Sequence, residues 1–211
     1  MRPTRLIVIL GTATDVGKTW IIAHLAAELA TLGMAVTARK PVQSHSSDDA
    51  ITDADILAAA TGECVSDLCP AHRSYPLAMA PPMAADVLGR PPFTIEDLVS
   101  EIAWPHLPTA VGLVETVGGP LSPLATDGDS VDLAAALHPD LLILVADAGL
   151  GAINAVRLAA AACAAIAAPL VVMLNRFDPA DDLHGRNRSQ LATDGFDLVI
   201  NVADLIDRLT P

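Results

Sequence analysis

The chain has 211 residues, of which 52% are apolar, and a formal net charge of −13. This length favours a single domain over residues 1–211, and the acidic balance disfavours nucleic acid and anionic membranes as partners. The apolar stretches are too short or too interrupted to span a membrane, the cysteines form no C-x-x-C pair, and the first apolar run is too brief for an export signal, so we expect a cytoplasmic protein.

A glycine-rich segment follows the first apolar run. Residues 6–10 predict a buried strand, and Gly11-Thr12-Ala13-Thr14-Asp15-Val16-Gly17-Lys18-Thr19 leads from it into a helix expected over residues 18–32. In such a turn the backbone N–H groups face the phosphates of a nucleotide, Lys18 would neutralise the β/γ oxygens, and the Thr19 hydroxyl would ligate Mg²⁺. We therefore expect Asp15, Val16 and Gly17 to contact the nucleotide as well. A chance Gly-Lys-Thr is the alternative, and the strand–turn–helix order disfavours it.

The rest of the chain alternates between short apolar strands and helices. Strands are expected at residues 35–39, 110–115, 141–146, 170–174 and 198–201, and helices at 53–60, 83–88, 95–104, 131–137 and 153–167, with one more helix on each side of the last strand. Residues 43–49 predict a polar loop, and residues 62–82 an irregular segment. This alternation is typical of an α/β fold, and with the glycine-rich turn it predicts a P-loop NTPase-like parallel sheet covered by helices on both faces. Ligands bind such sheets at the carboxyl ends of the strands.

Two charged residues follow strands at that edge. Lys40 comes after the second strand, where it would offset charge on a transferring phosphoryl group, unless it is an ordinary surface lysine. Glu115 ends the strand at 110–115, and an acid beside a phosphate loop is a typical Mg²⁺ ligand. Gly118, just beyond, would let the backbone approach the nucleotide closely. Asp147 follows another strand and ranks second to Glu115 for the metal.

Three further polar residues are weaker candidates. Asp55 could share Mg²⁺ with Glu115 and Thr19, whereas Asp53 is expected to cap the helix that starts there. Asn175 follows the strand at 170–174, where we expect its amide to contact the nucleotide base, with an Asx turn as the alternative. His45 lies near the expected site, and we interpret it as a solvated loop residue.

Together these motifs resemble those of the dethiobiotin synthetase family. The resemblance spans about residues 5–180 and rests on the long phosphate loop, on Lys40-Pro41-Val42-Gln43-Ser44, and on Glu115 followed by Gly118-Gly119. It implies an ATP- and Mg²⁺-dependent ligase that joins CO₂ to 7,8-diaminopelargonate through a phosphorylated carbamate. Lys18 and Lys40 would then be catalytic, with Thr14, Asp15 and Ser44 touching the carbamate. It also implies a homodimer in which Leu150–Asn154 of the partner receives the carboxylate tail of the substrate.

Two positions depart from the family pattern, and two alternatives to a synthetase stay open. The family usually has Glu-Gly-Ala-Gly-Gly, and this chain has Thr116 and Val117 in place of the second and third residues, which would narrow or block the substrate pocket. A non-catalytic nucleotide-binding relative is therefore one alternative. A ParA/MinD-type ATPase switch is the other, although such proteins carry a lysine early in the loop where this chain has Gly11-Thr12.

Overall fold

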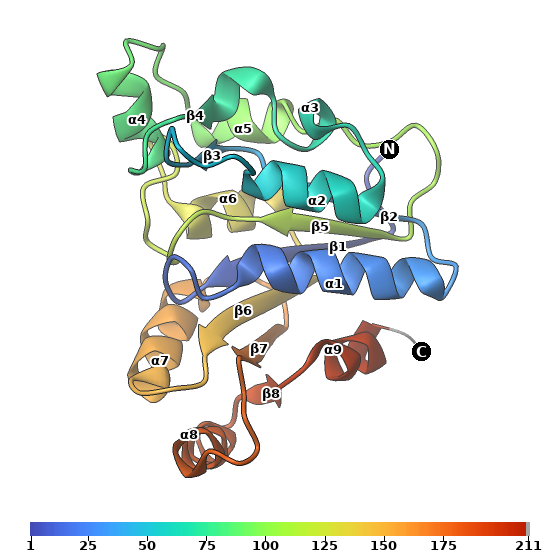
Figure 1. Ribbon diagram of the computed structural model, residues 1–211, viewed down its shortest axis with the longest axis vertical. Helices are drawn as coiled ribbons and strands as arrows, with labels where there is room; N and C mark the ends of the chain where they lie inside the picture. The colour runs from blue at the N-terminus through green and yellow to red at the C-terminus, as the bar shows by residue number, and fades with distance from the viewer. Residues whose placement is uncertain (210–211) are drawn as a thin grey trace.

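A six-stranded parallel sheet forms the centre of the molecule. The computed structural model describes residues 1–209, and its sheet has the order β2-β5-β1-β6-β7-β8. Every strand pairs in parallel with its neighbours, so the strand arrows of β1, β5 and β6 in Figure 1 point the same way. The strands are β1 (Arg5–Gly11), β2 (Val36–Arg39), β5 (Val111–Glu115), β6 (Leu141–Asp147), β7 (Leu170–Asn175) and β8 (Asp197–Val199).

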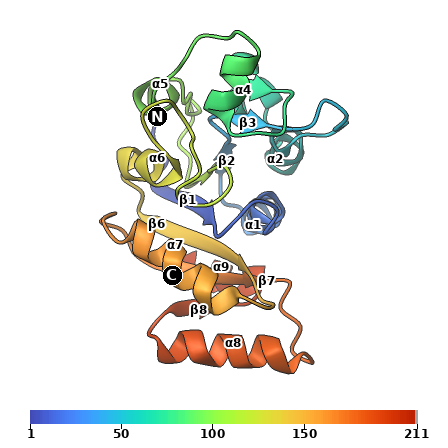
Figure 2. The ribbon, with the colours of Figure 1, turned by 90° about the vertical axis from the view of Figure 1, so that its left-hand side faces the viewer.

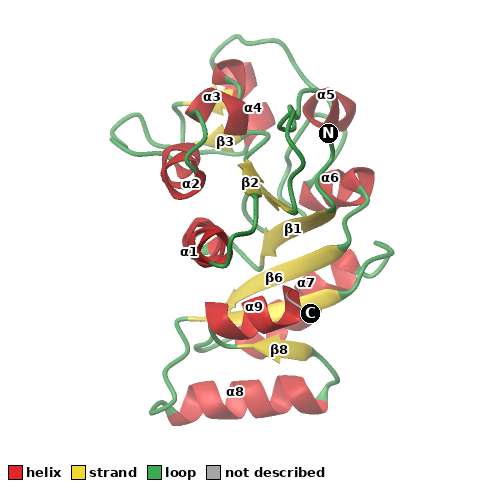
Figure 3. Cartoon of the chain, turned by 90° about the vertical axis from the view of Figure 1, so that its right-hand side faces the viewer, coloured by secondary structure: helices red, strands yellow, loops and turns green. Residues whose placement is uncertain are grey.

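Helices cover both faces of the sheet, as the end-on views of Figures 2 and 3 show. Alternate side chains of β1 point to opposite faces: Ile7 and Ile9 pack with one set of helices, and Leu6 and Val8 with the other. The first set is α1 (Lys18–Thr31), α2 (Asp53–Thr61), α3 (Val65–Leu68) and α9 (Val202–Leu209). The second is α4 (Pro81–Val87), α5 (Ile95–Ser100), α6 (Ser130–Leu137), α7 (Ala152–Cys163) and α8 (Asp182–Thr193). The α/β prediction is confirmed.

The structure also contains a two-stranded sheet that the sequence pattern does not predict. Its strands, β3 (Gln43–Ser44) and β4 (Ser74–Tyr75), pair in parallel within segments expected to be loop and irregular. The buried Gln43 amide donates to Thr52 and to Ser74 of β4, so a side-chain hydrogen bond adds to the backbone pairing of these strands. The small sheet fixes the backbone on which Ser44 lies.

Helix α3 and a 3-10 turn at Ala71–Arg73 lie in the segment 62–82, which the sequence pattern predicts to be irregular. The other differences concern the ends of elements. Asp147 and Asn175 are the last residues of β6 and β7 and pair with each other, rather than lying just beyond the strands. Helices α5 and α7 end four residues before their predicted limits. Within residues 1–209 the structure has no helix long and apolar enough to cross a membrane.

Candidate active site

The phosphate loop connects β1 to α1. A Cβ on Gly11 would lie 2.8 Å from the Ala13 carbonyl oxygen, which is too close. Gly17 has φ +96, and a Cβ there would collide with the Asn175 side-chain amide. Both positions therefore favour glycine. Across the described part of the chain, no acceptor lies opposite the backbone N–H groups of residues 13–19. A turn lined with free N–H groups at a helix N-terminus can bind the oxygens of a polyphosphate.

Lys18 folds back over this loop. Its Nζ donates to the carbonyls of Gly118 (3.1 Å) and Ala13 (3.3 Å), and only 6% of the residue is exposed. Burial lowers the pKa of Lys18, and the nearby Lys40 lowers it further. The carboxylates of Glu115, Asp53 and Asp15 oppose this shift, and an anion bound in the loop would add to their effect.

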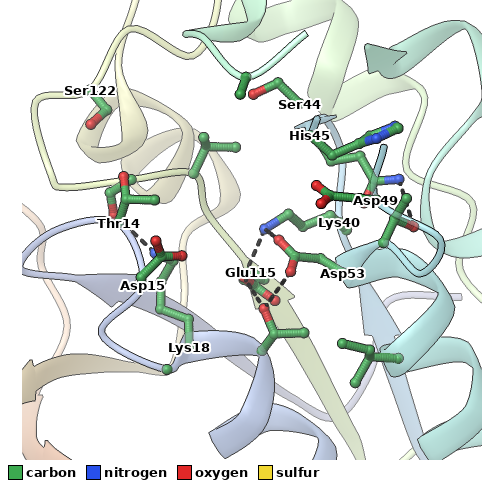
Figure 4. Close-up of a pocket in the computed structure, with 18 of the residues that line it drawn as sticks. Thr14, Asp15, Lys18, Lys40, Ser44, His45, Asp49, Asp53, Glu115 and Ser122 are labelled. Atoms are coloured by element: carbon green, nitrogen blue, oxygen red, sulfur yellow. Dashed lines mark hydrogen bonds and ion pairs between the residues drawn. The ribbon is translucent and has the colours of Figure 1, made fainter. Parts of the chain in front are cut away.

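A charged cluster lies next to the loop (Figure 4), with Lys40 and Glu115 buried and Asp53 half-exposed. The Lys40 ammonium is 2.7 Å from Glu115 Oε1 and 2.8 Å from Asp53 Oδ2. The Thr19 hydroxyl is 2.9 Å from one oxygen of each carboxylate. β2, β5, α1 and the start of α2 thus each bring one polar group to the same point at the carboxyl edge of the sheet.

The electrostatics of this cluster follow from its burial. Burial alone would lower the pKa of Lys40, but the carboxylates of Glu115 and Asp53 outweigh it and raise the pKa, so Lys40 is a cation at neutral pH. Burial raises the pKa of Glu115, and Lys40 opposes that shift. The second oxygen of Glu115 is buried and has no hydrogen-bond partner among the described residues. A buried unpaired carboxylate oxygen suits a site that receives a cation.

The carboxylate beside Thr19 belongs to Asp53, which corrects the expectation for Asp55. Thr52 caps α2, and Asp55, three residues later, completes a capping box by accepting the Thr52 N–H (2.8 Å) and hydroxyl (2.7 Å). Asp55 therefore serves the helix terminus. Asp53 stands at the first helical position, where its side chain is free to turn toward Thr19 and Lys40. The Thr-x-x-Asp spacing of a capping box is the sequence signal that could have separated the two.

The donors near Thr19 are therefore two carboxylates and one hydroxyl. No group of three or more His, Cys, Asp or Glu side chains arranged for a metal occurs within residues 1–209. Hard oxygen donors are nevertheless what Mg²⁺ prefers, and it commonly keeps waters and substrate phosphates as its other ligands. The set fits a nucleotide-bound Mg²⁺. Asp147, the second-ranked acid, instead pairs with Arg176 at 2.9 Å and is 49% exposed.

The cluster opens into a cavity of about 670 Å³ that also contains Thr14, Asp15 and Ser44. Figure 4 shows these polar groups around one space, with Thr14 and Asp15 on the side opposite Ser44 and Asp49. Sequence reasoning missed Asp49 and Ser122 in this lining, because both lie in irregular segments where no pattern marks them. His45 borders the cavity too, but its ring is engaged with Ser74 and the Ser46 carbonyl.

A second cavity of about 550 Å³ lies on the other side of the phosphate loop. Its lining is largely apolar and aromatic and includes Trp20, Phe177 and Ile200. Asn175 also borders it, with its Nδ2 donating to the Val16 carbonyl at 2.8 Å. A flat apolar group next to a polyphosphate site could bind here, as a nucleotide base would.

Comparison with known proteins identifies the family. A family model described as an AAA domain matches residues 5–200. An ATP-dependent dethiobiotin synthetase of Mycobacterium marinum is 39% identical over 158 residues, which are 74% of this chain and 68% of that protein. One from an Anaeromyxobacter species is also 39% identical, over 82% of this chain and 78% of its own length. The chain belongs to the dethiobiotin synthetase family.

Solved structures show the fold more widely. A plasmid partition protein of Borrelia burgdorferi has a TM-score of 0.57 at 12% identity, covering 94% of this chain and 90% of its own. The septum site-determining protein MinD of Pyrococcus horikoshii, solved with Mg-ADP, has 0.55 at 18% identity, covering 93% and 79%. At such identities the similarity shows a shared fold alone, and the alternative of a ParA/MinD-type switch has only this distant likeness in its favour.

Thr116 and Val117, which depart from the family pattern, differ in their position relative to the cavity. The Thr116 side chain is fully buried and donates to the Ile9 carbonyl at 3.2 Å, so it lies against β1 and away from the cavity. Val117 borders the cavity. Of the two bulkier residues, Val117 alone takes up space in the cavity.

Proposed function

We propose that this chain is an ATP-dependent dethiobiotin synthetase, which joins CO₂ to 7,8-diaminopelargonate and closes a cyclic urea. The observation that carries the proposal is the cluster of buried Lys40 and Glu115 with Asp53 and Thr19, beside a phosphate loop whose N–H groups have no acceptor among residues 1–209. Its membership in the dethiobiotin synthetase family supports the same assignment.

The nucleotide would bind across the two cavities. Its polyphosphate would contact the N–H groups of the loop from Asp15 to Thr19 and the Lys18 ammonium, next to the Gly118 backbone. Its base would lie in the more apolar cavity, beside Asn175. The Asn175 Nδ2 already donates to Val16, so this amide would hold the loop and border the base at once.

Mg²⁺ would be held by Thr19, Asp53 and Glu115. Bound there with ATP, the ion would neutralise charge on the phosphate oxygens. The unpaired oxygen of Glu115 and the nearby Asp53 carboxylate provide the anionic ligands. Asp55 is not part of this proposal.

For this reaction the site must mainly position the substrates and place positive charge near the phosphate. One substrate amine loses a proton and forms an N–C bond to CO₂, which gives a carbamate. A carbamate oxygen then attacks the γ-phosphorus and ADP leaves. The second amine attacks the carbonyl carbon of this mixed anhydride, loses a proton, and expels phosphate to close the ring. Lys18 and Lys40 would stabilise the negative charge that moves between these oxygens, and Thr14 and Ser44 would orient the carbamate.

We further propose a cytoplasmic homodimer. Leu150, between β6 and α7, is 93% exposed, which is unfavourable for a leucine unless another surface covers it. The partner's helix α7, with Leu150–Asn154 at its start, would then receive the substrate carboxylate at a helix N-terminus.

The test is phosphate release with ATP, Mg²⁺, bicarbonate and 7,8-diaminopelargonate, with each component omitted in turn and dethiobiotin measured by mass spectrometry. We expect one phosphate per dethiobiotin, and neither product without the diamine. ATP binding without diamine-dependent turnover would indicate a non-catalytic relative. Phosphate release that ignores the diamine would contradict the synthetase assignment.

A further inference from the structure

Arg176 reaches from the end of β7 to the phosphate loop. One guanidinium nitrogen donates to Asp147 Oδ2 at 2.9 Å, and another donates to the Asp15 carbonyl at 2.8 Å. Asp147 is itself fixed, because its other oxygen accepts the Gly149 N–H at 2.9 Å. Asp15 and Arg176 both have φ near +60, a conformation that non-glycine residues rarely adopt without local support.

Two consecutive carbonyls of the loop are therefore held from the end of β7. Arg176 binds the carbonyl of Asp15, and Asn175 binds that of Val16. In a trans peptide the carbonyl and the following N–H point in opposite directions. Because these two carbonyls point toward Asn175 and Arg176, the N–H groups of Val16 and Gly17 point away from those side chains. Both N–H groups are among those without an acceptor in the described residues.

We propose that Arg176, braced by Asp147, is a positioning residue for the nucleotide: it sets the Asp15–Val16 peptide so that its N–H faces the polyphosphate. The inference rests on the proposed function in one respect, that a nucleotide polyphosphate binds at this loop. It assigns a task to an arginine that borders both cavities and that the reaction itself does not use.

A purely structural role fits Arg176 less well. The Arg176 and Asp147 side chains are 58% and 49% exposed, and exposed ion pairs contribute little to the stability of the fold. The contact with Asp15 restricts a loop that must otherwise be ordered when the nucleotide binds. Pre-ordering a binding loop increases affinity by reducing that cost. The effect should therefore appear in nucleotide affinity rather than in folding.

The experiment is calorimetric titration of the full chain with Mg-ATP and with inorganic triphosphate. For Arg176→Ala we expect both dissociation constants to rise by about five- to tenfold and in equal proportion, because the peptide faces phosphate and not base. Asp147→Ala should raise both by about two- to threefold, since it only braces the arginine. Arg186→Ala is the matched control: it removes the same charge from an exposed ion pair on α8 and should change neither constant by more than about twofold.

Steady-state kinetics give an independent readout. Arg176→Ala should raise the KM for ATP and leave the KM for the diamine and kcat nearly unchanged, and thermal melting should show an intact fold. The inference is overturned if Arg176→Ala leaves triphosphate binding unchanged, whether or not ATP binding weakens. It is also overturned if Asp147→Ala tightens binding, because that result would mean that Arg176 acts by its charge. Binding is measured without the diamine. A failure of dethiobiotin synthesis would therefore contradict the proposed function without affecting the measured nucleotide affinities.

Discussion

Asp53 and Asp55 are two positions apart, yet their side chains do different work. Asp53 lies beside Thr19 and Lys40, whereas Asp55 completes the cap of α2. Asp53→Asn should raise the Mg²⁺ concentration required for half-maximal turnover by at least about tenfold, since it replaces an anionic ligand with a neutral one. Asp55→Asn is the matched control and should cost only about 1 kcal/mol of stability, with Mg²⁺ activation unchanged. Magnesium titrations of phosphate release separate the two, and the reverse pattern would return the metal role to Asp55.

Glu115 combines a functional role with a structural one. Glu115→Ala should abolish turnover, because the only carboxylate of β5 at the phosphate loop is lost. It should also destabilise the fold by about 3 kcal/mol, because the buried Lys40 loses its buried partner and keeps only the partly exposed Asp53. Chemical denaturation measures the second effect and the phosphate-release assay the first. Near-normal activity in this variant would move the metal role to Asp147.

At the scale of elements, an ion pair joins the end of α2 to β2. Glu63, just after α2, accepts from Thr37 (2.6 Å), from the Ala38 N–H (3.0 Å) and from the buried Arg39 (2.8 Å). Burial alone would raise the pKa of Glu63, but these hydrogen bonds outweigh it and lower the pKa. Glu63→Ala should therefore lower the free energy of unfolding by about 2 kcal/mol at neutral pH.

The pH dependence of this effect has a defined sign. A carboxyl whose pKa is lowered in the folded state stabilises the fold above its unfolded pKa, near 4.5, and loses that contribution as the pH falls through the lower folded value. Urea denaturation should show the difference between Glu63→Ala and the natural chain shrinking below about pH 4.5. The exposed Glu96 of α5 provides the control, and Glu96→Ala should stay within about 0.5 kcal/mol at every pH. A difference that grows on acidification would refute this account.

The sequence is most informative where hydrophobic burial decides the structure. Apolar runs identify the neighbouring strands β2 and β5, which end at Arg39 and Glu115, so the sequence alone assigns Lys40 and Glu115 to the carboxyl edge of the sheet. Side-chain hydrogen bonds leave no such periodic signal. The small sheet held by Gln43, the orientation of Asp53 and the reach of Arg176 all depend on such bonds, so sequence patterns do not predict them.

At the scale of the whole molecule, a strongly acidic chain places two lysines beside the phosphate loop. The net charge is −13, yet Lys18 and Lys40 are buried together at the phosphate loop. An acidic surface repels polyanions in general, while lysines concentrated in a cleft attract one small anion to one place. This arrangement suits a small-molecule nucleotide better than nucleic acid.

Leu150 is where the assembly can be tested. The residue is 93% exposed at the carboxyl edge of the sheet. If a second copy covers it, Leu150→Asp should weaken the dimer by at least about 2 kcal/mol, since a leucine contributes that much when buried and a carboxylate resists burial. Sedimentation velocity should then show monomers at concentrations where the natural chain is dimeric. The KM for the diamine should rise, because its carboxylate loses the partner's helix, while ATP binding stays unchanged.

Leu107→Asp is the matched control for that experiment. Leu107 is 77% exposed in the segment that leads into β5, at the amino end of the sheet and away from the cavity. The same substitution there adds the same charge and removes the same apolar surface, so it controls for effects on solubility and net charge. We expect it to leave both the dimer and the diamine KM unchanged. If both variants behave alike, or if Leu150→Asp stays dimeric with normal kinetics, the second subunit does not complete the substrate site through this segment.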